Sequence, residues 1–105
     1  MRQERIINRI RLLMRSVFPE ARTVLYGSQA RNTARIDSDI DLLILLPDTY
    51  QGKNFVQRRN EIMDSLYDIE IEEGVPISPL VLIHKIWKQR ISPFTMNVRR
   101  EGVEL

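Results

Sequence analysis

The chain has 105 residues, of which 43% are hydrophobic and 29% charged, and its formal net charge is +2. A chain of this length is expected to fold as one domain over residues 1–105, with no room for a second. The absence of cysteine excludes a disulfide framework and a thiolate metal site, and it suits a reducing cytoplasm. The most apolar stretch near the start, residues 6–17, is interrupted by three arginines, so neither a signal peptide nor a membrane span is expected. The protein is therefore predicted to be soluble and cytoplasmic.

The charges are distributed unevenly along the chain. Residues 1–35 hold eight basic and two acidic residues, residues 36–73 hold three and ten, and residues 74–105 hold five and two. The sequence pI is about 9.3, but a strongly acidic centre matches a nucleic-acid phosphate backbone poorly. Direct binding of nucleic acid is therefore not expected.

The N-terminal third predicts a helix, a strand and a tight turn. Apolar residues recur at three- and four-residue steps over residues 6–17, which is the period of an amphipathic helix. Residues 23–26 predict a short strand that stops at Gly27. Ser28 is placed to cap a short helix over residues 28–31.

The middle third predicts a buried strand and a long helix. Residues 32–38 have turn chemistry, and residues 40–46 form a run that is apolar on both faces, as is typical of a central strand. Apolar residues at helical spacing over residues 53–73 predict a helix, with Gly74 as its stop. The alternation of Ile and Glu at residues 69–72 leaves a strand open as an alternative there.

The C-terminal third predicts another strand and two short helices. Residues 77–83 are rich in strand-forming residues, and Pro79 favours an edge position or a late start because it lacks a backbone donor. Residues 84–90 and 93–100 predict short helices, and residues 102–105 an extended end. The expected fold is α/β (α+β), a small mixed sheet with helices packed on it.

Two aspartates at the mouth of the apolar run form the first candidate site. Side chains alternate along a strand, so Asp39 and Asp41 point to the same face, about 6.6–7 Å apart at the backbone. Carboxylates this close raise one another's pKa unless a cation compensates. Oxygen ligands of this kind suit Mg²⁺ or Mn²⁺, so the pair predicts a divalent metal site.

The turn at Gly27 and Ser28 is the second candidate site. Glycine allows close approach to the backbone, and N–H groups at a helix N-terminus attract phosphate oxygens. Taken singly, such a turn is usually an ordinary cap, and two spaced aspartates are usually a solvated turn. Together they favour facing metal and phosphate sites, because charges at the start of an aliphatic strand are costly without compensation.

The same residues carry a family resemblance. The segments GSQARN at residues 27–32 and SDIDLLI at residues 38–44 resemble the signature of the minimal nucleotidyltransferases of the DNA polymerase β superfamily. The resemblance implies a polymerase β palm-like fold and Mg²⁺-dependent transfer of a nucleotidyl group, AMP from ATP, to a hydroxyl while pyrophosphate leaves. Minimal members are often paired with an all-helical HEPN toxin, and MntA-like antitoxins among them add AMP to it. The implied partners are thus a nucleoside triphosphate and a HEPN-type protein.

The resemblance also implies roles for individual residues. Gly27 and Ser28 would contact phosphate, and Asp39 and Asp41 would bind metal and be catalytic. Arg31 would orient the turn or meet a carboxylate or phosphate, although it could equally be a surface helix residue. Because so short a chain has no separate lid for the base, a partner or a second copy is expected to complete the site.

The sequence departs from the family pattern at one position. The family supplies a third carboxylate from the third strand, and Ser78 aligns with it. Serine is neutral and is not a useful base near pH 7. Asp68, Glu70, Glu72 and Glu73 could reach the site instead, or form the solvated face of a helix.

Three functions follow, in order of preference. The first is a nucleotidyltransferase that uses ATP or a related nucleotide. The second is an antitoxin weakened in catalysis by Ser78, which neutralises a toxin by contact alone. The third is a nucleic-acid-binding domain that uses the arginine-rich first helix.

Overall fold

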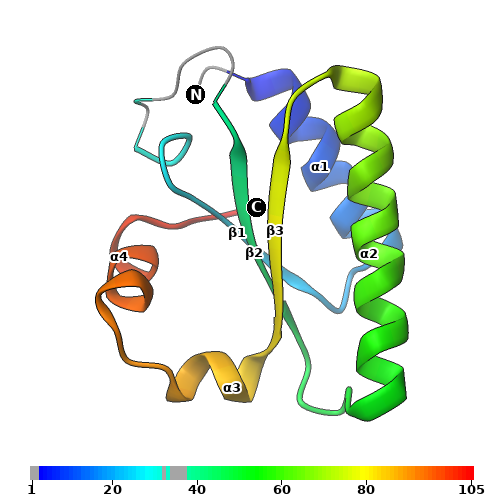
Figure 1. Cartoon of the computed structure of the whole chain (residues 1–105), viewed down its shortest axis with the longest axis vertical. Helices are drawn as coiled ribbons and strands as arrows, with labels where there is room; N and C mark the ends of the chain where they lie inside the picture. Colours follow the sequence, from blue (N-terminus) through cyan, green and yellow to red (C-terminus); the bar gives the residue numbers. More distant parts are fainter. Residues whose placement is uncertain (1–2, 32, 34–37) are drawn as a thin grey trace.

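The computed structural model describes residues 3–31, 33 and 38–105, which contain four helices and four strands. Figure 1 labels all of them except β4. Helices α1 and α2 lie together on one side of the strands, while α3 and α4 lie away from them (Figure 1). The elements are α1 (Glu4–Val17), β1 (Arg22–Tyr26), β2 (Ile40–Leu46), α2 (Gly52–Glu73), β3 (Ile77–Ile83), α3 (His84–Gln89), α4 (Pro93–Glu101) and β4 (Val103–Glu104).

The strands form one mixed sheet in the order β3-β2-β1-β4. Strand β1 runs antiparallel to both β2 and β4, whereas β2 and β3 are parallel. The predicted mixed α/β fold is therefore confirmed. So is the edge position that Pro79 predicted for the third strand, since an edge tolerates a missing donor.

Strand β2 is apolar on both faces because each face packs against helices. One face contributes to a large core with α1 and α2, which includes Ile10, Leu42, Ile44, Leu46, Ile62 and Leu66. The other face contributes to a smaller core with α3 and α4, which consists of Val24, Leu43, Leu45, Trp87 and Val98. Because side chains alternate along β2, Asp41 lies on the face of this smaller core.

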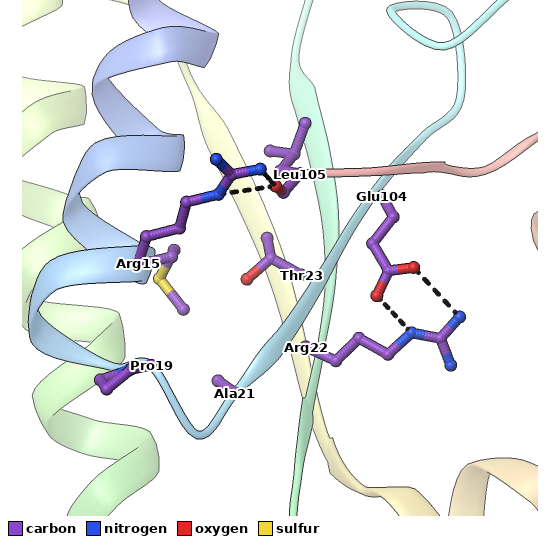
Figure 2. A pocket seen from close by; sticks show the side chains of 8 residues that line it. Arg15, Pro19, Ala21, Arg22, Thr23, Glu104 and Leu105 are labelled. Atoms are coloured by element: carbon purple, nitrogen blue, oxygen red, sulfur yellow. Dashed lines mark hydrogen bonds and ion pairs between the residues drawn. The ribbon is translucent and has the colours of Figure 1, made fainter.

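The C-terminal segment is held against α1 and β1. Arg15 donates from Nε and Nη2 to the carbonyl oxygen of Leu105, at 3.1 and 2.6 Å, and Leu105 N–H donates to Thr23 O at 2.9 Å. Arg22 Nε donates to Glu104 Oε1 at 2.6 Å. Figure 2 shows the contacts of Arg15 with Leu105 and of Arg22 with Glu104, all residues that line a hollow of about 370 Å³. They fix β4 beside β1 and so fix the end of α4, which precedes it.

Helix α2 runs through residues that the sequence left ambiguous. Residues 69–72 are helical, so the alternative of a strand there is wrong, and the predicted long helix is confirmed. Gly74 ends the helix in the left-handed conformation, at φ 70°, and its N–H donates to Glu70 O at 2.8 Å.

Two other predictions concern the loop before β2 and the membrane. The turn expected over residues 32–38 falls mostly on residues outside those described, namely 32 and 34–37. Within the described ranges, no helix has both the length and the apolar character needed to span a membrane.

Candidate functional site

Sheet register places Asp41 in the middle of a row of three residues. Asp41 pairs with Tyr26 of β1 on one side and with Ser78 of β3 on the other. Residues opposite one another in neighbouring strands point to the same face, so all three lie on the side of α3 and α4. Asp41 is half-buried, and Asp39, just before β2, is exposed. The two aspartates, called the acid pair below, therefore stand at the sheet end where β2 begins.

The pKa of the Asp41 carboxyl shows how the acid pair interacts. Burial raises this pKa above its usual value, the charge of Asp39 raises it further, and the charge of Arg31 lowers it. The charge of Asp41 also adds to burial in raising the pKa of the Tyr26 hydroxyl. A bound cation would stabilise the ionised form of Asp41, so these hard oxygen donors fit Mg²⁺ or Mn²⁺.

Gly27 lies directly against the carboxylate of Asp41. A Cβ placed on Gly27 would lie 2.5 Å from Asp41 Oδ2, closer than any ordinary contact, and the residue has φ +75°. Glycine is thus required twice, once for the backbone conformation and once for the space. The turn after β1 and the first residues of β2 consequently face each other, as the sequence predicted for the two candidate sites.

Residues 27–31, which we call the glycine turn, form a hydrogen-bonded turn rather than the predicted short helix. Arg31 N–H donates to Gly27 O at 3.1 Å, and Thr33 N–H donates to Ser28 O at 3.0 Å. Ser28 is therefore not a helix N-cap, and the prediction of a helix over residues 28–31 is wrong. Gln29, fully buried, donates from Nε2 to Gln3 Oε1 at 2.9 Å and so ties the turn to the start of α1.

Arg31 meets a carboxylate, one of the two roles that the resemblance implied. Its Nη1 donates to Glu101 Oε2 of α4 at 3.1 Å. Arg31 is exposed, as the alternative of a surface helix residue predicted, but it lies in a turn and not in a helix. Its charge also reaches Asp41, whose pKa it lowers.

The acids of α2 do not replace the third carboxylate. The buried face of α2 packs on the opposite side of the sheet from Asp41, in the core that contains Leu42 and Ile44. Three of the four candidates have other partners there: Glu70 accepts from Ile77 N–H at 2.6 Å, Glu73 pairs with Arg5 at 2.5 Å and with Arg9 at 3.0 Å, and Glu72 pairs with Arg9. Asp68 is exposed on the same helix.

Ser78, which the sequence aligned with the third acid, does lie beside Asp41 across the parallel ladder. Throughout residues 3–31, 33 and 38–105, no three His, Cys, Asp or Glu side chains group closely enough to hold a metal. The acid pair is therefore a two-carboxylate set, which suits Mg²⁺ when substrate phosphates supply further oxygens.

Comparison with known proteins identifies the family. The family model described as "Nucleotidyltransferase domain" matches residues 7–99. The chain belongs to this family. No curated protein sequence matches it at a significant level.

Solved structures share the fold of this nucleotidyltransferase domain at low identity. One is a toxin-antitoxin with AMP-PNP, at 17% identity and a TM-score of 0.58, covering 97% of this chain and 71% of that one. Two are mutants of the toxin-antitoxin MntA-HpeT. A tyrosine-to-alanine mutant has 21% identity and a TM-score of 0.59, with 94% and 70% covered. A mutant with two aspartates changed to glutamate has 19% identity and a TM-score of 0.58, with 92% and 69% covered.

Helix α4 adds residues to the site of the nucleotidyltransferase domain that the sequence did not single out. A hollow of about 210 Å³ lies beside the glycine turn, and its lining comes from the turn, the end of β1 and α4. The ring of Phe94 packs edge-on against the rings of Tyr26 and Trp87, with centroid distances of 5.5 and 6.5 Å. These contacts join the hollow to the smaller core. The residues that line it are Tyr26, Gly27, Arg31, Phe94, Asn97, Val98 and Glu101. No local motif signals Glu101, because it is 70 positions from Arg31.

Proposed function

We propose that this nucleotidyltransferase domain transfers a nucleotidyl group, AMP from ATP, to a hydroxyl of a partner protein, with a HEPN-type helical toxin as the acceptor. The observation that supports this most directly is the contact between Gly27 and Asp41. It brings a turn suited to phosphate and a pair of acids suited to a divalent cation to one end of the sheet. The solved structure with AMP-PNP and the MntA-HpeT complexes have the same fold, which supports the choice of nucleotide and acceptor.

Each site residue has a role in this proposal. Gly27 and Ser28, which lie in a turn, offer backbone N–H groups to the triphosphate, while Arg31 neutralises phosphate charge. Asp39 and Asp41 would bind Mg²⁺. The bound ion supplies charge stabilisation at the phosphate that is transferred.

The reaction forms a bond from the acceptor oxygen to the α-phosphorus and breaks the bond from that phosphorus to the bridging oxygen of the departing pyrophosphate. The hydroxyl proton leaves to solvent, because Ser78 is neutral where the family has an acid. Catalysis by this chain therefore depends mainly on holding reactants in place and on neutralising charge.

The decisive experiment is co-expression with the protein encoded in the adjacent reading frame, followed by intact mass measurement of that protein. We expect an AMP-sized increase that requires Asp39 and Asp41. The control is the double variant Asp39→Asn with Asp41→Asn, which removes both charges and keeps side-chain size. If this variant modifies the neighbour as the unaltered chain does, the proposal is wrong.

A second function, an antitoxin that acts by contact alone, is favoured by one observation. Ser78, which the sequence aligned with the third acid, pairs with Asp41 across the sheet, and α2 packs on the opposite face. This function predicts that the double asparagine variant still binds and neutralises its partner. Protection from the toxin without any mass increase would establish it.

The third function, nucleic-acid binding through the arginine-rich helix, loses support from the structure. Arg5 and Arg9 of α1 pair with Glu72 and Glu73 of α2, and Arg15 binds the carbonyl of Leu105. Much of the positive charge of α1 is therefore compensated within the chain, so it is a poor match for a phosphate backbone.

A further inference from the structure

The glycine turn and helix α4 are joined by an ion pair. Arg31 Nη1 and Glu101 Oε2 lie 3.1 Å apart, on the rim of the hollow that also contains Gly27. Glu101 is the last residue of α4, and Gly102 packs closely against Val24 Cγ1 of β1, where a Cβ would lie at 2.6 Å. The position of Glu101 is thus set by the packing of α4 on the sheet.

Arg31 lies close to the acid pair as well as to Glu101. Its backbone N–H donates to Gly27 O at 3.1 Å, and a Cβ placed on Gly27 would lie 2.5 Å from Asp41 Oδ2. A cation in this place is suited to bind an anion bridged to the acid pair by a metal ion. Among the described residues, its guanidinium donates to the carboxylate of Glu101.

The ion pair is built in a way that allows exchange. The side chains of Arg31 and Glu101 are 48% and 27% exposed, and exposed ion pairs are weak. A phosphate group offers several charged oxygens to the planar guanidinium and can bind it in two places at once. Glu101 also has a second cation, since Arg100 Nη2 lies 3.7 Å from its Oε1. Release of Arg31 would therefore not leave Glu101 without a counter-charge.

We propose that Glu101 is a positioning residue that occupies Arg31 when no nucleotide is bound, and that a phosphate group of the nucleotide takes its place. Glu101 then competes with the polyphosphate for one guanidinium and sets the affinity for nucleotide through it. This inference rests on the proposed function, because it assumes that a nucleoside triphosphate binds at the glycine turn.

The test is a cycle of four proteins titrated calorimetrically with AMP-PNP and Mg²⁺: unaltered, Glu101→Gln, Arg31→Gln and the double variant. We expect Glu101→Gln to lower the Kd about two- to fivefold, in keeping with the strength of an exposed ion pair. In the Arg31→Gln background the same substitution should change nothing, because no guanidinium remains to be released. Glu104→Gln, which removes an exposed acid paired with Arg22, is the matched control and should leave the Kd unchanged.

A second variant and a spectroscopic signal keep the test independent of how Glu101→Gln folds. Arg100→Gln removes the other cation of Glu101, so Glu101 should hold Arg31 more firmly and the Kd should rise. The NMR signal of the Arg31 side-chain N–H should move when AMP-PNP is added to the unaltered protein.

Several results would overturn the inference. A Kd that Glu101→Gln leaves unchanged or raises would do so. If Glu101→Gln lowers the Kd equally with Arg31 present and with Arg31→Gln, Glu101 repels the nucleotide by its charge and does not compete for Arg31. If the unaltered chain does not bind AMP-PNP with Mg²⁺, the proposed function itself fails and this inference fails with it.

Discussion

Gly27→Ala tests the contact on which the candidate site depends. The substitution adds a Cβ that would lie 2.5 Å from Asp41 Oδ2, and it places alanine at φ +75°. Gly74→Ala provides a matched control, because Gly74 has φ +70° and nothing lies within 4 Å of its Cβ position. The two variants share the backbone cost and differ in the contact with Asp41.

The expected magnitudes follow from these two terms. Left-handed backbone costs an L-residue about 1–2 kcal/mol, and this cost applies to both variants. An ordinary contact begins near 3.4 Å, so the Asp41 carboxylate must retreat by 0.9 Å (3.4 less 2.5). Moving it off its preferred rotamer costs about 0.5–1.5 kcal/mol. We therefore expect Gly27→Ala to lower the free energy of unfolding by about 1.5–3.5 kcal/mol, and Gly74→Ala by about 1–2 kcal/mol.

The functional effect should separate the variants more clearly. A displacement of about 1 Å in a catalytic group can reduce a rate on the order of 100-fold, so Gly27→Ala should nearly abolish transfer of AMP. Gly74→Ala should retain it. Urea unfolding followed by far-UV circular dichroism gives the stabilities, and intact mass of the co-expressed neighbour gives the transfer. Equal losses of stability in the two variants, together with unchanged transfer by Gly27→Ala, would refute the reasoning.

Three further substitutions test other parts of the structure. Asp39→Asn should lower the pKa of Asp41, because it removes a charge that raises it; a carboxyl NMR titration that shows no change or a rise would contradict this. Arg58→Met should lower the free energy of unfolding at pH 7 by about 1–2 kcal/mol, since it removes a partly buried ion pair with Glu20. The hydrogen bond from Arg58 lowers the pKa of Glu20 to about 2, so this stabilisation should be present above pH 4.5 and lost as the pH falls toward 2. The measurement is urea unfolding at a series of pH values. If Arg58→Met lowers the free energy of unfolding equally at high and at low pH, the reasoning is wrong. Ser78→Asp should tighten Mn²⁺ binding measured by calorimetry, because it places a third carboxylate beside Asp41, and unchanged or weaker binding would argue against a metal there.

Much of the fold could be predicted because several elements carry strong local signals. Residues 42–46 are all apolar, which is typical of a strand that is covered on both faces. The strand predicted over residues 40–46 has the same bounds as β2. Gly74 marked the end of α2 because a left-handed residue stops a helix. Pro79 placed β3 at an edge through its missing donor.

The errors arose where contacts distant in sequence decide the structure. Residues 28–31 have a plausible N-cap, but the buried contact of Gln29 with Gln3 and the close approach of Gly27 to Asp41 favour a turn. Glu101 could not be found from local pattern, because only the packing of α4 brings it to Arg31.

The position of β3 at the border of the sheet determines how the acid pair can be reached. Only β3 separates β2 from this border of the sheet, and neighbouring strands lie about 4.8 Å apart. Ser78 of β3 is exposed. A hydroxyl carried on the surface of a large folded molecule can therefore come in sideways, without threading into a deep cleft. Pro79, the next residue, withholds a backbone donor from this border, which makes it a poor template for an added strand and keeps the lateral route open.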